Sequence, residues 1–458
     1  MNKPKVLFFA RDYQASFFAH LNSEYYESIL VTLTLAEKKT IENTGNKVQA
    51  CFEEEYDELV ADSVPNDYFL TSYAADRYLG SLAINQRQEV LGKEIAFWAN
   101  VLDKYQPVMA LNEAIAIEMS EVLYIECQKK GVKLISWMSL PLSNSFYWQK
   151  NPLYSDMPPE VADLIPSNES IEKAKVHIEK VKQGYGQPFY STNLPSRFNL
   201  KIFMKGAALF MRERLLRLKM SSAPKRIAVH GDASQIYQDQ MVTTFNSIFH
   251  KYDKLEKYSN YELIFYPLHY EPEAVLNYIS EFNDNQESFI ENLAKCIGQN
   301  QLLVVKEHPN QPGRLLLKKY RSLKKRVSNV LFLPAEAPTK EIIKQSKLLI
   351  TQTSTAGIEG LIIEKPVIVF GKIFYDQHPQ INKVTSFKEV RDIIRKETWK
   401  TPTIEDNISF LAKVAEYSKE GNPFPHADLY DPQNIKHVVQ AIEEQLKKEI
   451  EKREEFSK

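Results

Sequence analysis

The chain has 458 residues, of which 43% are hydrophobic and 26% are charged, so its length favours two domains with separate cores over one. Its 58 Lys and Arg residues nearly balance its 59 Asp and Glu residues, which excludes the overall positive field that a nucleic-acid-binding protein uses. Three scattered cysteines without a CxxC pair, and a sequence without a signal peptide or a membrane-spanning apolar run, lead us to expect a reducing cytoplasm.

The first half of the sequence alternates strand-like and helix-like segments. Four short apolar runs have strand character, at residues 5–9, 28–33, 107–111 and 132–137. A long helix is predicted around Trp98 from apolar residues at helical spacing. Asn112 is expected to cap a second helix, from Glu113 to Lys130. The alternation predicts a parallel sheet covered by helices.

Two segments in the middle differ from this pattern. Residues 151–198 are rich in Pro, Ser, Asn and charge, so we interpret them as an irregular insertion. A helix is predicted at 199–220. Its basic face consists of Lys201, Lys205, Arg212 and Lys219. This helix either rests on anionic lipid, at the cytoplasmic face of the inner membrane, or simply connects the two domains.

The second half repeats the alternation of strands and helices. Its first strand is at 226–229 or 263–267, and the later strands are at 302–305, 330–333, 348–350 and 367–370. The sequence ends in a long helix with one apolar stripe from Ile435 to Ile450. We therefore predict two facing Rossmann-like α/β domains, residues 1–225 and 226–458, with ligands at the carboxyl ends of strands in the cleft between them.

A phosphate site is predicted where the strand 302–305 ends. Lys306 and His308 follow the strand, and Pro309 stops the strand ladder there, so both side chains are expected to donate to a phosphate. The alternative is that Lys306 pairs with Glu307 on the surface and His308 is an ordinary loop histidine.

The next strand opens into a hydroxyl-rich helix start, where side-chain hydroxyls and free backbone amides would favour an anion. The hydroxyl residues expected to contact the phosphate are Thr353, Ser354 and Thr355. Gly357 would allow a close approach, and Glu359, one turn beyond Thr355, would reach a sugar or ribose hydroxyl. A simple capping residue and a solvent-facing glutamate are the alternatives.

Two further sets of polar residues follow strand ends. His269, Glu271 and Glu273 come after 263–267, where they would contact the donor or transfer a proton, or form structural salt bridges. A metal is disfavoured because the segment has no HxxxH or multiple-Asp spacing. In the first half, Glu113 is the candidate catalytic base or nucleophile, and Asp12 is a weaker candidate. A helix-capping role is the alternative for Glu113.

The ordered motifs YPLHYEPE, VVKEHP, TSTAGIEG and KPVIVFG resemble the bacterial capsular and surface polysaccharide biosynthesis family, which includes β-Kdo transferases. The resemblance covers roughly residues 260–395 and implies glycosyltransferases of the GT-B type. It implies that the carboxyl-terminal domain binds a nucleotide sugar, and that the amino-terminal domain receives the acceptor. By position it assigns donor phosphate to His308, Ser354 and Thr355. Gly360, where a bulkier residue is expected, leaves the donor's identity open.

The leading functional prediction is transfer of a sugar from a nucleotide-sugar donor to a surface polysaccharide or lipid-linked glycan acceptor. No metal or other cofactor is expected, because Lys306, His308 and the helix start would neutralise the phosphate. One alternative is a CDP-glycerol-type polyol-phosphate transferase. Another is a non-catalytic protein that binds nucleotide or glycan within a polysaccharide assembly or export complex.

Overall fold

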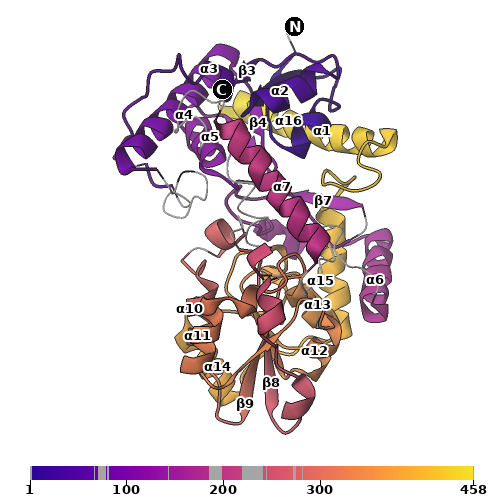
Figure 1. Cartoon of the computed structure of the whole chain (residues 1–458). Helices are drawn as coiled ribbons and strands as arrows, with labels where there is room; N and C mark the ends of the chain where they lie inside the picture. The colour runs from indigo at the N-terminus through magenta and orange to yellow at the C-terminus, as the bar shows by residue number, and fades with distance from the viewer. Residues whose placement is uncertain are drawn as a thin grey trace. The chain divides into compact units, whose positions relative to one another are not determined.

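The chain forms two compact units (Figure 1). Unit 1 comprises Met1–Ser155, Arg217–Asp232 and Tyr417–Lys458, and unit 2 comprises Asp156–Leu216 and Ala233–Glu416. The computed structural model describes residues 3–66, 68–70, 79, 82–142, 144–184, 199–218, 241–243, 245–271, 275–280 and 282–456. Among the helices of these residues, none has the length and apolarity needed to cross a bilayer.

Unit 1 is built on a five-stranded parallel sheet with the strand order β3-β2-β1-β4-β5. Its strands are β1 (Lys5–Ala10), β2 (Glu27–Thr32), β3 (Ala50–Cys51), β4 (Met109–Leu111) and β5 (Lys133–Ile135). Its helices are α1 (Tyr13–Phe18), α2 (Leu35–Glu42), α3 (Phe52–Glu55), α4 (Ile84–Tyr105) and α5 (Glu118–Lys129). Successive side chains of a strand face opposite ways, so alternate residues of β1 enter different cores. Leu7 and Phe9 belong to one core, and Val6 and Phe8 belong to the other.

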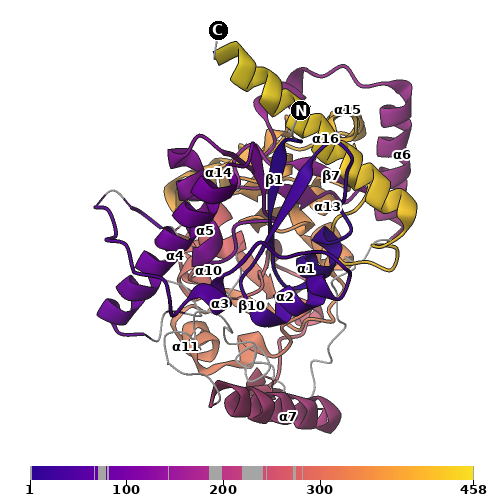
Figure 2. The same cartoon turned by 90° about the horizontal axis from the view of Figure 1, so that it is seen from above.

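The end of the chain completes unit 1. Helix α16 (Pro432–Phe456) lies beside β1 (Figure 2), and its Val438, Ile442 and Leu446 share a core with Phe8. A small antiparallel sheet joins β14 (Lys419–Glu420) to β7 (Ser145–Trp148) and β6 (Trp137–Ser139). The long terminal helix is as predicted. The compact units differ from the predicted division at residue 225, because the apolar stripe of α16 is buried against the first sheet.

Unit 2 contains a six-stranded parallel sheet with the order β10-β9-β8-β11-β12-β13. Its strands are β8 (Glu262–Pro267), β9 (Gln301–Lys306), β10 (Val330–Leu333), β11 (Leu348–Thr351), β12 (Val367–Val369) and β13 (Asn382–Lys383). This is the doubly wound order, in which the direction of strand addition reverses between β8 and β11. Its principal helices are α10 (Gln286–Ala294), α11 (Lys318–Arg326), α12 (Thr339–Gln345), α13 (Ala356–Ile362), α14 (Phe387–Lys396) and α15 (Ile404–Tyr417).

Three local predictions need correction or lie out of reach. The segment 151–198 is not irregular throughout, since α6 (Asn168–Gln183) begins at a capping Ser167, and 185–198 lie outside the described residues. Helix α5 begins at Glu118 rather than Glu113, because Asn112 is fully buried at the end of β4 and caps no helix. The predicted helix at 199–220 is present as α7 (Leu200–Arg217), whereas the strand at 226–229 lies outside the described residues.

Candidate functional site

The carboxyl edge of the unit 2 sheet gathers the predicted donor-site residues. His269 follows β8, Lys306 and His308 are at the end of β9, and Thr353 follows β11. β8 is hydrogen-bonded to both β9 and β11, so these loops are neighbours at the reversal of strand order. Ligands of doubly wound sheets bind at this position.

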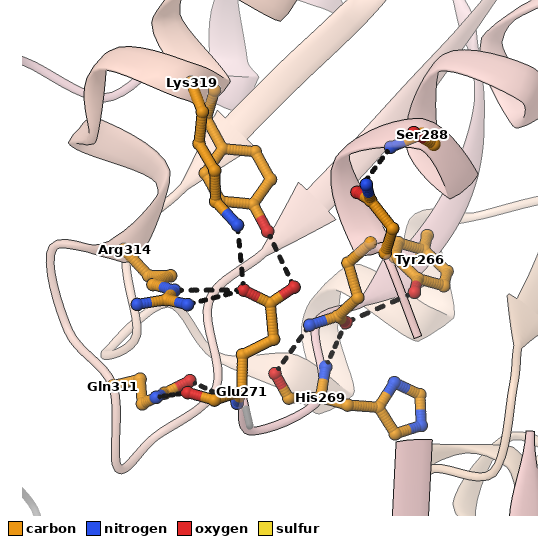
Figure 3. Close-up of polar contacts among 10 residues, drawn as sticks. Tyr266, His269, Glu271, Ser288, Gln311, Arg314 and Lys319 are labelled. Carbon is orange, nitrogen blue, oxygen red and sulfur yellow. Dashed lines mark hydrogen bonds and ion pairs between the residues drawn. The ribbon is translucent and has the colours of Figure 1, made fainter. Parts of the chain in front are cut away.

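His269 is buried, at 5% exposure, and it joins the loops after β8 and β11. Its Nε2 accepts a hydrogen bond from the backbone N–H of Thr353 at 3.1 Å. Its backbone N–H donates to Oε1 of Gln286 at 2.7 Å, and Nε2 of Gln286 donates back to its carbonyl at 3.0 Å (Figure 3). Burial, and secondarily His308, lowers the pKa of His269 to about 3. The ring is therefore neutral, and its accepting Nε2 places the proton on Nδ1.

Lys306 is a buried cation with little compensation. Its side chain is 4% exposed, and Nζ donates to the backbone carbonyl of Glu307 at 3.3 Å. Among the described residues, no carboxylate lies within ion-pair distance of Nζ. Burial lowers the pKa of Lys306 to about 8, against the opposing charges of Glu307, Glu336 and Glu359. A bound anion would supply the missing counter-charge.

Glu307 does not form the surface pair with Lys306 that was the alternative interpretation. It is 1% exposed and accepts from the amides of Gly313, at 2.8 Å, and Leu315, at 2.7 Å. The hydroxyl of Tyr252 donates to it at 2.8 Å. Burial raises the pKa of Glu307 to about 7. Glu307 therefore fixes the loop after β9.

His308 is half-buried next to Lys306. Its Nδ1 accepts from the backbone N–H of Asn310 at 3.2 Å, and Tyr270 contacts its ring with the centroids 5.8 Å apart. Burial, and then the charge of Lys306, lowers the pKa of His308 to about 4. The ring is neutral near pH 7, and its Nε2–H would donate a hydrogen bond to a phosphate oxygen.

The helix start after β11 is more closed than the sequence indicates. The amide of Ser354 donates to Oγ1 of Thr351 at 2.9 Å, and the amide of Ala356 donates to Oγ of Ser354 at 3.2 Å. The amide of Gly357 donates to the carbonyl of Ser354 at 2.9 Å. These donors do not converge on an open point. Thr355 is exposed, and the buried hydroxyl of Thr353 has no hydrogen-bond partner among the described residues.

The close approach that Gly357 allows is made by the ring of Tyr375, and not by a ligand or a neighbouring backbone segment. A Cβ at Gly357 would overlap the Tyr375 ring, whose hydroxyl donates to the carbonyl of Ser354 at 2.6 Å. Glu359 is half-buried on α13, one turn after Thr355. Burial raises the pKa of Glu359 to about 7, while Lys306 and Lys340 act in the opposite direction. Glu359 therefore lies within the electrostatic reach of Lys306.

Glu271 has a structural ion pair rather than an open carboxylate. It accepts from Nη2 of Arg314 at 2.6 Å and from Nζ of Lys319 at 3.0 Å (Figure 3). The charges of Arg314 and Lys319 lower its pKa even though burial, the largest single effect, raises it. Glu271 thus anchors the 3₁₀ turn Arg314–Leu316 and α11, as the salt-bridge alternative predicted. Glu273 lies outside the described residues.

Glu113 lies at the corresponding strand-order reversal of unit 1, after β4. The Tyr13 hydroxyl donates to its Oε1 at 2.8 Å, and Nε2 of Gln14 donates to its Oε2. Burial raises the pKa of Glu113, although these donors and Arg11 oppose that shift. Helix α1 therefore holds both carboxylate oxygens. The other candidate, Asp12, has a side chain that is 78% exposed.

Sequence patterns alone missed several residues of these sites. Tyr13 and Gln14 carried no motif, since only their contacts with Glu113, about a hundred residues away in sequence, make them relevant. Gln286 likewise has no sequence signal for its bonds to His269. Among the described residues, no group of three or more His, Cys, Asp or Glu side chains is arranged to hold a metal ion.

The part of the chain that resembles known proteins includes the residues of the unit 2 sheet edge. Residues 215–388 match the family model described as capsule polysaccharide biosynthesis protein. A stretch of 107 residues is 33% identical to the capsule polysaccharide export protein KpsS of Escherichia coli. It covers 21% of this chain and only 26% of that protein.

Solved structures give weaker likenesses. The β-Kdo 2,4 transferase KpsC of Thermosulfurimonas dismutans has 13% identity and a TM-score of 0.39, over 73% of this chain and 87% of that chain. Its β-Kdo 2,7 counterpart has 12% identity and a TM-score of 0.36, over 92% and 93%. The UDP-GlcNAc 2-epimerase of Methanocaldococcus jannaschii has 11% identity and a TM-score of 0.27, over 90% and 99%.

Proposed function

Because residues 215–388 match the capsule polysaccharide biosynthesis family, we propose that this protein is a glycosyltransferase. It moves a sugar from a nucleotide-sugar donor to a surface polysaccharide or a lipid-linked glycan. The donor binds at the carboxyl edge of the unit 2 sheet. That edge lies within the matched segment and at the strand-order reversal where doubly wound sheets bind nucleotides.

The observation that carries this proposal is the buried ammonium of Lys306. A buried cation with one weak hydrogen bond and no paired carboxylate among the described residues is costly, and the shift of its pKa to about 8 expresses that cost. The diphosphate of a nucleotide sugar would pair with this charge. The neutral His308 next to it would donate from Nε2 to the same group.

Catalysis would then rest on charge stabilisation at the departing phosphate. As the bond from the sugar to the diphosphate breaks, negative charge grows on the leaving oxygen, and Lys306 would stabilise it. Glu359, whose pKa is raised to about 7, would bind a donor hydroxyl. Thr353, Ser354 and Thr355 would contact phosphate or sugar once the closed loop opens.

Glu113 is the proposed base for the acceptor hydroxyl. A carboxylate whose pKa burial has raised accepts a proton more readily than an exposed one. Tyr13 and Gln14 hold its two oxygens in a fixed orientation. To take the proton, Glu113 would exchange one of these hydrogen bonds for the acceptor hydroxyl.

The experiment is a donor panel with purified protein. CMP-, UDP-, GDP- and CDP-linked sugars are titrated by calorimetry against the wild type, Lys306→Ala and His308→Ala. We expect one donor class to bind and to lose at least tenfold in affinity in Lys306→Ala, because a charge-assisted contact is lost. Lys388→Ala is the matched control, since this exposed lysine is also in unit 2. Equal affinity of wild type and Lys306→Ala would remove the donor site from this edge.

Product analysis separates the remaining functions. Transfer of a sugar, seen as the mass of one added residue on a glycan acceptor, supports the proposal. Transfer of glycerol phosphate from CDP-glycerol would assign a polyol-phosphate transferase instead. Donor binding without turnover in the presence of acceptor would favour a non-catalytic binding component of an assembly or export complex.

A further inference from the structure

Helix α7 (Leu200–Arg217) and the residue that follows it expose a row of large apolar side chains. Their exposed fractions lie between 58% and 74%, whereas side chains of this kind are normally covered. The row consists of Leu200, Met204, Met211, Leu215 and Leu218. At 3.6 residues per turn these five positions fall within about 60° of one another around the helix axis. They therefore form a continuous stripe along the helix.

The opposite side of α7 is the packed one. Gly206 is buried, and a Cβ there would lie 2.8 Å from Sδ of Met241, so the helix rests against the segment that starts at Met241. That neighbouring segment, helical at 241–243 and 245–249, adds exposed apolar side chains of its own. Val242, Ile248 and Phe249 are 53%, 53% and 66% exposed. The exposed apolar stripe of α7 thus faces away from the segment against which the helix packs.

A row of cations runs beside the stripe. Lys201, Lys205 and Arg212 are exposed, and they lie within about 40° of one another around the axis, next to the apolar positions. A protein partner with an apolar surface would not require this row. A bilayer with anionic headgroups fits both features, because the headgroup phosphates attract the cations while the apolar side chains enter the acyl boundary.

We propose that α7 is an interfacial helix that lies in the plane of an anionic membrane, with its apolar stripe in the bilayer and its basic row among the headgroup phosphates. The helix is about 27 Å long and no helix of the described residues is suited to crossing a bilayer, so it lies on the surface rather than spanning it. Membrane contact at α7 does not depend on the donor site, and each can be present without the other.

The test measures sedimentation of the full chain with vesicles of phosphatidylglycerol and phosphatidylcholine, and with vesicles of phosphatidylcholine alone. We expect binding to the anionic vesicles, weakened by salt, and little binding to the neutral ones. Met204→Glu and Leu215→Glu should each reduce binding at least tenfold. Lys201→Glu and Arg212→Glu should each reduce it at least fivefold, because each cation favours the surface by about that factor.

Matched controls carry the same substitutions elsewhere in unit 2. Ile165, which is 91% exposed, and Lys325 on α11 each become Glu, and both variants should bind like the wild type. Unchanged thermal unfolding verifies that the α7 variants are folded. Equal binding of Leu215→Glu and wild type would overturn the proposal. Equal binding to anionic and neutral vesicles would also overturn it. A third contrary result would be that the wild type does not bind vesicles but forms a dimer that Leu215→Glu dissociates.

Discussion

The backbone N–H of Thr353 donates to Nε2 of His269 over 3.1 Å, and this bond links the two loops that flank the strand-order reversal of unit 2. Both groups are buried. The amide thus depends on the imidazole for its hydrogen bond, and the imidazole must be neutral to accept it. The loop that carries Ser354 and Thr355 is therefore positioned by a residue from a different strand.

His269→Ala should lower the free energy of unfolding by about 1–3 kcal/mol, because the buried amide of Thr353 loses its acceptor. Urea unfolding at pH 7 measures this change. His20→Ala, at an exposed histidine, should change the value by less than about 0.5 kcal/mol. Equal stability of His269→Ala and the wild type would show that the bond does not form in solution.

Donor affinity should fall as the pH rises through about 8. An anion binds the protonated form of Lys306, whose pKa is about 8 without ligand, so above that pH binding must also supply the energy of protonation. Calorimetry from pH 7 to pH 9 measures the slope. Lys306→Arg keeps its charge throughout this range, so its affinity should vary much less with pH.

Glu359 titrates in the neighbouring pH range and provides an internal check. Its pKa is raised to about 7, so its deprotonation below pH 8 adds negative charge near the donor and weakens anion binding further. Glu359→Gln should remove the part of the pH dependence near pH 7 and leave the part near pH 8. A profile that is flat in the wild type would contradict both assignments.

Gly357→Ala should destabilise unit 2 by about 1–3 kcal/mol and weaken donor binding. The added Cβ overlaps the ring of Tyr375, which would have to withdraw from the carbonyl of Ser354. Gly360→Ala on the same helix is the control. Its Cβ would lie 3.1 Å from a methyl group of Val367, a contact that small shifts relieve, and alanine favours the helix. Thermal unfolding and donor titration compare the two variants.

Glu113→Gln should reduce kcat by a factor of about 10² to 10⁴ and leave donor affinity unchanged, since general-base catalysis contributes in this range. Steady-state transfer assays measure kcat, and calorimetry measures donor affinity. Asp12→Asn should behave like the wild type because that side chain is exposed. If Glu113→Gln retains full activity, Glu113 has only the structural role of binding Tyr13 and Gln14.

Glu271→Gln should affect stability rather than chemistry. The substitution leaves the largely buried Arg314 without its carboxylate, and breaking a buried pair costs about 3–5 kcal/mol. The contact with Lys319, whose side chain is 39% exposed, adds little. Denaturant unfolding measures the loss. At a temperature where the variant is folded, its kcat should match that of the wild type, and a lower kcat would restore Glu271 to the donor site.

The sequence predicted the fold well because strand and helix periodicity is local. It also predicted which residues share one sheet edge, since the carboxyl ends of neighbouring parallel strands must meet there, and His269, Lys306 and Thr353 do so. The match of residues 215–388 confirms the family resemblance. The catalytic and binding roles of these residues stay predictions.

Side-chain partnerships between distant segments were not predictable in this way. Nothing in the segment around Glu271 indicates that Arg314 and Lys319, more than forty residues later, take up its charge. Likewise, the apolar stripe of α16 shows that the helix is buried on one side, but not which sheet covers it. Both outcomes depend on tertiary contacts between segments that are far apart in the sequence.

The packing of α16 against the first sheet has a consequence for biosynthesis. The first sheet emerges from the ribosome long before Val438, Ile442 and Leu446, which share a core with Phe8, have been translated. Until then, that core lacks the part of its cover that α16 supplies and exposes apolar surface of the kind that chaperones recognise. Completion of unit 1 therefore depends on α16, whereas every strand of the unit 2 sheet is translated before that helix.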